Sequence, residues 1–193
     1  MNIFVLDVDP VKAAQAHGDK HVVKMLLEAC QLLYTAHWVI SYPHLLEYKA
    51  PVKLAQVQKH LAVPESIRSA PSSTTRPNEP GFRPCHIYHP CAVWVRDSVS
   101  NYEFTCKLAL ALADEFKYRY PAKGPHACEA HAQWLLANPP CFMMDGGLTP
   151  FVQAMDPEYR RDDPVEGYRN YYRTSKQERG LTTYKLREPP EWL

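Results

Sequence analysis

The chain has 193 residues, 22 Lys and Arg against 21 Asp and Glu, and 46% hydrophobic residues. That length suits one compact domain and would be cramped for two. The near-neutral total does not indicate a polyanion partner, although a local basic face matters more than the sum. The start lacks a basic segment followed by a long apolar core, and no stretch approaches the ~20 apolar residues of a membrane span. We therefore expect a cytoplasmic protein with reduced cysteines and no membrane partner.

The first part of the chain predicts an apolar segment, a short helix and one long helix. Residues 3–8 read IFVLDV before a turn signal, which favours a lone strand or an extended arm laid across helices. A short helix is expected over 11–17, with Gly18 as its C-terminal stop. Asp19 is then the expected N-cap of a helix over 19–40. Apolar residues cover most of its circumference, so it should lie at the centre of the domain.

The middle of the chain predicts three further helices separated by loops. Apolar spacing indicates a helix over 51–62 and a long one over 90–120, followed by another over 126–137. Residues 64–84 are rich in Pro, Ser and Thr without periodicity, which is typical of a surface loop or mobile flap outside the core. The segment 138–150 contains paired glycines that mark a tight turn.

The C-terminal part predicts one more helix and an aromatic tail. Pro164 opens a helical stretch that Gly180 should end, and the tail carries Trp192, which would dock if ordered. The total is four or five main helices with almost no strand pattern. The sequence therefore predicts an all-α fold in a single domain spanning 1–193.

A line of polar residues runs along the predicted central helix. His21, Lys24, Glu28, Gln31 and Thr35 recur at spacings of three and four, which places them on one face. A base, an amine and a carboxylate aligned on a mostly buried helix is typical of an active site. The same pattern is also typical of the solvated face of an amphipathic helix, and the spacing alone does not choose between them.

Glu28 is the most natural catalytic group of this line. A carboxylate on a buried helix can act as a base or stabilise a developing positive charge on a sugar. Lys20 and Lys24 are possible nucleophilic amines, but an amine attacks only when it is uncharged. Lys24 lies one turn from His21 and Glu28, and the carboxylate would tend to keep it protonated.

Metal binding is a weaker interpretation of the nine histidines and six cysteines. The densest cluster is CHIYHPC at 85–91, and a structural zinc site would need a second pair of cysteines elsewhere. Cys128 and Cys141 are too irregular to supply it, and His89 is more simply the residue before a helix start. We expect neither a metal nor another cofactor.

Basic and aromatic residues are interleaved in the C-terminal segment. Such a mixture suits phosphate contacts and base stacking. Acidic residues dilute it, so a charged surface helix is the alternative. The residues concerned are Arg160, Arg161, Arg169, Arg173, Lys176, Arg179, Lys185 and Arg187, with Tyr159, Tyr168, Tyr171, Tyr172 and Tyr184.

Several of these segments resemble known phage proteins. The segments DKHVVKM, HPCAVWVR and GGLTPF are similar to those of small phage-encoded proteins, over most of the chain. More distantly, short motifs over about half of the chain resemble the pyrimidine-dimer DNA glycosylase/lyases of T-even phages. Asp19, His21 and Glu28 match a D-x-H motif followed by a catalytic Glu, residues 95–104 are similar to the start of a second long helix, and 168–172 are similar to an aromatic C-terminal motif.

The resemblance implies an all-helical enzyme that acts on a pyrimidine base of DNA in the cytoplasm of an infected bacterium. Glu28 would stabilise the sugar intermediate, His21 would orient a water or a phosphate, and Lys24 would contact phosphate or serve as the amine. Extruding a base would require a nearby aromatic side chain. The implied DNA-backbone contacts are Arg96, Arg169 and Lys176, and the candidate aromatic residues are Trp94 and Tyr172.

The chain departs from the glycosylases at its N-terminus. Their nucleophile is the α-amine of a small residue that is exposed when the initiating Met is removed. Here residue 2 is Asn, which is too large for Met1 to be removed efficiently. Either the Met1 amine or a lysine substitutes, or the lyase step is absent. Two other classes remain open: an enzyme that modifies a base or nucleotide without excision, and a non-enzymatic phage protein that binds a host target.

Overall fold

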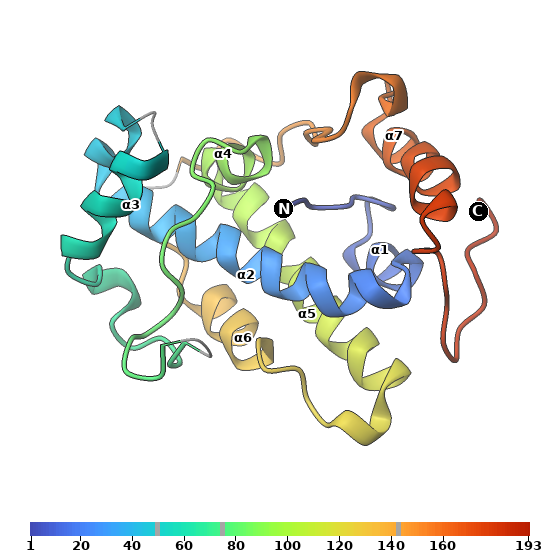
Figure 1. The fold of residues 1–193 in the computed structure, drawn as a ribbon, viewed down its shortest axis with the longest axis horizontal. Coiled ribbons are helices and arrows are strands. Elements are labelled where there is room, and N and C mark those ends of the chain that lie inside the picture. Colours follow the sequence, from blue (N-terminus) through green and yellow to red (C-terminus); the bar gives the residue numbers. More distant parts are fainter. Residues whose placement is uncertain (49–50, 74–75, 142–143) are drawn as a thin grey trace.

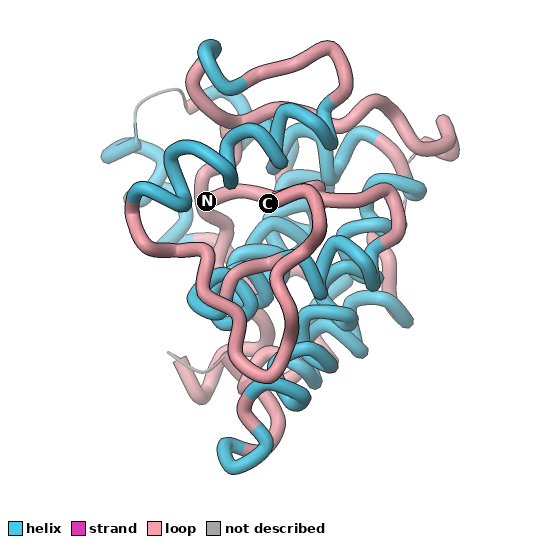
Figure 2. Tube along the Cα trace, turned by 90° about the vertical axis from the view of Figure 1, so that its right-hand side faces the viewer, coloured by secondary structure: helices cyan, strands magenta, loops and turns pink. Residues whose placement is uncertain are grey.

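The computed structural model describes residues 1–48, 51–73, 76–141 and 144–193. Residues 74–75 and 142–143 of the two predicted loops, 64–84 and 138–150, therefore lie outside the described residues, as do 49–50. Within the described residues the secondary structure is helical, with no strand and one isolated bridge between Ser72 and Pro80. Figure 2 shows this arrangement of helices and loops. The all-α prediction is confirmed. In the same residues, no helix is long and apolar enough to cross a membrane.

The α-helices follow the predicted order with two changes, at residue 98 and near the C-terminus. Their bounds are α1 Pro10–Ala16, α2 Asp19–Ser41, α3 Pro51–His60, α4 Pro90–Asp97, α5 Val99–Arg119, α6 Glu129–Ala137 and α7 Pro164–Tyr171. A π-helical turn over Tyr172–Lys176 continues α7, so the predicted last helix is not a regular α-helix throughout. Gly180 ends this segment with φ of 61°, which glycine adopts readily.

Helix α2 occupies the centre of the molecule (Figure 1) and packs against α4, α5 and α6. Leu26, Leu33 and Trp38 are each no more than 1% exposed. The buried side chains of the described residues form one connected core, from the N-terminal arm to the π-helical turn. The central position predicted for this helix is confirmed, because a helix that is apolar on most sides must be surrounded.

The start of α2 differs in detail from the prediction. Gly18, not Asp19, is the N-cap residue, and Asp19 is the first residue of the helix. The Asp19 carboxylate binds Arg119 and the main-chain N–H of Lys185 instead. A Cβ at Gly18 would lie 2.1 Å from the carbonyl oxygen of Leu181, so only glycine fits where the C-terminal tail crosses this helix end.

The predicted long helix over 90–120 is two helices. Ser98 has extended backbone angles, ends α4, and caps α5 by accepting a hydrogen bond from the main-chain N–H of Asn101. The apolar spacing continues through the break, because both helices face the same core. The Ser98 side chain competes for a main-chain donor, which favours a cap over a continuous helix.

The N-terminal residues form an extended arm, the second of the two predicted alternatives. Ile3, Phe4, Val5 and Leu6 are each no more than 4% exposed and have no strand partner within the described residues. In Figure 1 the arm leads from the N-terminus to α1, and its Phe4 ring meets side chains of both α2 and α7. The arm is therefore held by side-chain packing.

The described part of the segment 64–84 is irregular, as predicted, apart from a 3-10 turn over Glu65–Ile67, but the expectation that it lies outside the core is wrong. Ile67 and Phe82 are buried, and the indole N–H of Trp38 donates to the Phe82 carbonyl at 3.0 Å. Arg83, near the end of the segment, donates to the carbonyls of Gln58 and Leu61. Two apolar anchors inside a polar segment are enough to dock it, because each buries a large side chain.

Candidate functional site

A cavity of about 440 Å³ lies between the N-terminal arm, α2 and the C-terminal segment. This volume is in the range of small-molecule sites. It includes all three residues of the predicted catalytic set. The lining residues are Met1, Asn2, Phe4, Lys20, His21, Lys24, Met25, Glu28, Ala154, Tyr171, Lys176, Arg179 and Leu181.

Glu28 carries the only carboxylate among the described lining residues, and its side chain is 9% exposed. Its Oε2 accepts a hydrogen bond from the main-chain N–H of Asn2 at 2.9 Å and lies 3.7 Å from the Met1 α-amine. Its Oε1 lies 3.2 Å from Nζ of Lys24. A buried carboxylate is costly without partners, and here two amines and one amide surround it.

His21 lies at one side of the cavity, and its Nδ1 is hydrogen-bonded to the Tyr172 hydroxyl at 2.7 Å. Burial, together with the nearby His17, Lys176 and Lys24, lowers the pKa of His21 to about 3. The ring is therefore neutral near pH 7. One nitrogen is engaged by Tyr172, so the other is free to orient a water or an oxygen of a ligand.

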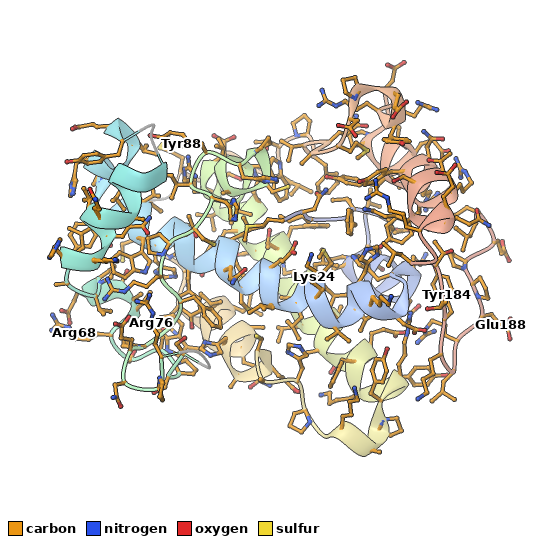
Figure 3. All side chains as sticks on the ribbon, in the orientation of Figure 1. Lys24, Arg68, Arg76, Tyr88, Tyr184 and Glu188 are labelled. Carbon is orange, nitrogen blue, oxygen red and sulfur yellow. The ribbon has the colours of Figure 1, made fainter. Side chains whose placement is uncertain are left out.

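The cavity is predominantly cationic. Lys24, the one of these cations labelled in Figure 3, projects from the first half of α2 and is 67% exposed. Lys176 is only 7% exposed, and its Nζ donates to the Tyr171 hydroxyl and lies 4.2 Å from that ring's centre. Lys20 and Arg179 add two further charges to the lining. An excess of cations around one carboxylate favours an anionic ligand.

The structure brings only some of the predicted residues together. Glu28, His21, Lys24 and Lys176 share the cavity, whereas Tyr172 lies behind it and supports His21. The predicted line on α2 continues differently beyond Glu28. Thr35 is fully buried and bonds the main chain of Cys85 rather than facing the cavity.

The two predicted arginine contacts lie elsewhere. Arg96 donates to the carbonyls of Ile87 and Ala92, and Arg169 pairs with Asp7 and donates to the Leu6 carbonyl. Neither lines the cavity around Glu28. Their geometry shows intramolecular roles, and DNA contact by either arginine stays a prediction.

The aromatic residues expected beside the site also need correction. Trp94 packs against Phe104 and Phe151 and is 4% exposed, so it lines no part of the cavity. Phe4 and Tyr171 are the aromatic residues that do. Sequence spacing could not indicate Phe4, because the arm reaches α2 through a fold-back that no local pattern encodes.

Asp19 and His21, the two named residues of the matched D-x-H motif, have separate roles. Asp19 faces Arg119 and the tail, while His21 faces the cavity. A second cavity of about 540 Å³ lies near the tail, where Arg169 and Arg187 line it but are already paired with acidic residues. No group of three or more His, Cys, Asp or Glu in the described chain is arranged to hold a metal ion.

Comparison with known proteins gives no relative for this chain: no protein-family model, no curated protein and no solved structure matches it.

Proposed function

We propose that this chain is a DNA-base enzyme of the glycosylase class and that the cavity around Glu28 is its active site. The observation that carries the proposal is a buried carboxylate with amine nitrogens at 3.7 and 3.2 Å in a cationic cavity. Breaking a glycosidic bond develops positive charge at C1′ of the sugar, and a nearby carboxylate stabilises it. The cations would hold the flanking phosphates.

An amine beside the carboxylate supplies the nucleophile in this proposal. The nitrogen lone pair attacks C1′, and the C1′–N bond breaks with its electron pair leaving on the base. Glu28 takes the proton that the amine loses. The Met1 amine and Lys24 are the candidates, and Met1 is favoured because its side chain is 6% exposed and holds the amine in the cavity, whereas Lys24 is 67% exposed.

The aromatic rings and the imidazole that line the cavity suit a base that has been extruded from the DNA duplex. Phe4 and Tyr171 offer ring faces, and neutral His21 offers a hydrogen-bonding nitrogen. Stacking on an aromatic ring offsets part of the few kcal/mol that unstacking costs. These residues also support the pyrimidine-directed activity implied by the resemblance to the phage glycosylases.

An enzyme that modifies a base or nucleotide without excision is the second candidate, because the same cavity would bind the same ligand. Mass spectrometry of nucleosides from cells with and without the protein separates the two. A non-enzymatic binding protein would leave Glu28 open to water on a convex surface. The 9% exposure of its side chain, in a cavity, favours an enzyme over that class.

The test compares Glu28→Gln with Glu103→Gln, a change at a half-exposed glutamate on α5 that pairs with Lys107 outside the cavity. We expect Glu28→Gln to lower cleavage of the glycosidic bond at pyrimidine dimers in ultraviolet-irradiated duplex DNA by at least about 100-fold, the scale of lost acid–base or charge stabilisation. DNA affinity should stay within about 2-fold, because one neutralised carboxylate does not weaken phosphate contacts.

Borohydride trapping on a duplex with an abasic site then locates the amine by peptide mapping. We expect a covalent adduct at Met1 in the wild type and in Glu103→Gln. Cleavage of the glycosidic bond at the wild-type rate in Glu28→Gln would remove the proposal, and an adduct at Lys24 would reassign the nucleophile.

A further inference from the structure

Asn2 lines the proposed active site with both ends of its side-chain amide hydrogen-bonded, and it is 8% exposed. Its Nδ2 donates to the Ala154 carbonyl at 2.8 Å. Its Oδ1 accepts from the main-chain N–H of Ile3 at 2.8 Å and from the Cys91 thiol at 3.5 Å. An amide side chain with donors and acceptors matched on both ends holds one orientation.

The Tyr168 hydroxyl completes this arrangement from α7. Its one proton is shared between Asn2 Oδ1 and the Val152 carbonyl, each 2.9 Å away, and its oxygen accepts from the main-chain N–H of Ala154 at 3.2 Å. Tyr168 is 0% exposed, and the edge of its ring packs against Phe4. The first residues of the chain are thereby tied to segments more than 150 positions away, through one buried phenol and one main-chain segment.

The tie bears directly on Glu28, because the main-chain N–H of Asn2 donates to Glu28 Oε2 at 2.9 Å. The Met1 nitrogen, one residue before, lies 3.7 Å from the same oxygen. A shift of the Asn2 side chain would therefore move both the donor that orients the carboxylate and the amine beside it. Displacements of about 1 Å in a reacting pair are enough to cost large factors in rate.

We propose that Asn2 and Tyr168 are positioning residues: they hold the N-terminal segment so that Glu28 and the amine face each other in reactive geometry. This inference rests on the proposed function for its catalytic consequence. Its structural core, that the Tyr168–Asn2 pair holds the Asn2 amide on Glu28, can be measured without any activity.

The first measurement is the pH titration of the Asn2 main-chain amide proton by NMR. In the wild type that proton should shift as Glu28 gains its proton, because the carboxylate accepts the bond. In Tyr168→Phe and in Asn2→Leu, which keeps residue 2 large enough to retain Met1, we expect this titration shift to fall to less than half. Tyr102→Phe is the matched control, since Tyr102 is equally buried and its hydroxyl bonds His37 and the Leu135 carbonyl.

The second measurement is borohydride trapping on abasic-site DNA. At saturating DNA, Tyr168→Phe should trap about 10- to 100-fold more slowly than wild type, with the dissociation constant within about 2-fold. Tyr102→Phe should trap at the wild-type rate even where it lowers the melting temperature similarly. A role in stability alone would make the two phenylalanine variants behave alike.

The outcomes separate this proposal from the proposed function. An Asn2 amide that still follows Glu28 in both variants overturns the positioning role, as does wild-type trapping in Tyr168→Phe. Should the wild type trap nothing while the amide titration is lost in both variants, the glycosylase function fails and the positioning of Glu28 stands. Asn2→Leu carries the test where Tyr168→Phe does not fold.

Discussion

At the scale of single residues, burial sets the protonation state of three histidines in this protein. His17, His21 and His37 lie in the core or at its edge, and burial lowers the pKa of each, to about 4, 3 and 4 respectively. Nearby positive groups reinforce this at His17 and His21. These rings are neutral in the folded chain near pH 7, whereas the unfolded chain protonates them near pH 6.5.

The lowered values predict the sign of the pH dependence. As the pH falls, the unfolded state binds protons that the folded state does not bind. The contribution of these histidines to the unfolding free energy is therefore complete above about pH 6.5 and is lost as the pH falls toward 4. Each such histidine costs about 1.4 kcal/mol of unfolding free energy per pH unit in that window. His37→Gln should therefore flatten the fall in unfolding free energy between pH 6 and 5 by about that amount.

Urea unfolding at closely spaced pH values measures this change in slope. His37 is suited to the test because it lies outside the proposed site, bonded to Tyr102 and Ser66. His44→Gln, at an exposed position, is the matched control. Equal slopes for wild type and His37→Gln would contradict the prediction.

At the scale of secondary-structure elements, hydrogen bonds at the junction of α4 and α5 hold these helices to a distant segment. Ser98 separates α4 from α5: its Oγ caps α5 and donates to the Gly147 carbonyl at 2.7 Å. The Asn101 side chain adds bonds to the Trp94 carbonyl and to Thr149. This junction therefore ties the two helices to the segment after residue 143, which leads towards Ala154 at the proposed site.

Ser98→Ala should lower the unfolding free energy by about 1 to 2 kcal/mol, because it removes the cap of α5 and a second buried hydrogen bond. Ser100→Ala, two residues further along α5, removes a hydroxyl without those roles and should change it by less than about 0.5 kcal/mol. Urea denaturation of both variants gives the comparison. A loss below 0.5 kcal/mol for Ser98→Ala would contradict the assignment of the cap.

At the scale of the whole molecule, one buried ion network joins segments distant in sequence. Arg119, with a side chain 0% exposed, pairs with Asp19 of α2 at 3.0 Å and Glu115 of α5 at 2.6 Å. It also donates to the Gln15 carbonyl of α1. Glu115 in turn accepts from Arg187 of the tail. The network fastens α1, α2 and the tail to the end of α5.

Arg119→Met should lower the unfolding free energy by about 3 to 5 kcal/mol, because it leaves the Asp19 and Glu115 carboxylates partly buried without their central cation. Lys107→Met removes a cation from an exposed pair with Glu103 and should cost less than about 1 kcal/mol. Denaturant unfolding of both variants compares them. Similar small losses would show that the network contributes little.

The sequence by itself determined the helices and part of the site. Apolar spacing and the residues at helix ends act over three or four positions, so α1, α2, α6 and the all-helical class could be predicted locally. The same spacing placed His21, Lys24 and Glu28 on one face. It could not separate α4 from α5, because both keep one apolar side toward the core across Ser98.

Only the tertiary structure decided what the polar line on α2 faces. The arm folds back over 26 positions to bring Asn2 to Glu28, and α7 brings Tyr168 from the other end of the chain. The tertiary structure also directs Asp19 away from the cavity, towards Arg119, and pairs Arg169 with Asp7. Such contacts depend on how buried surfaces and charges are matched across the whole core, which a local pattern does not encode.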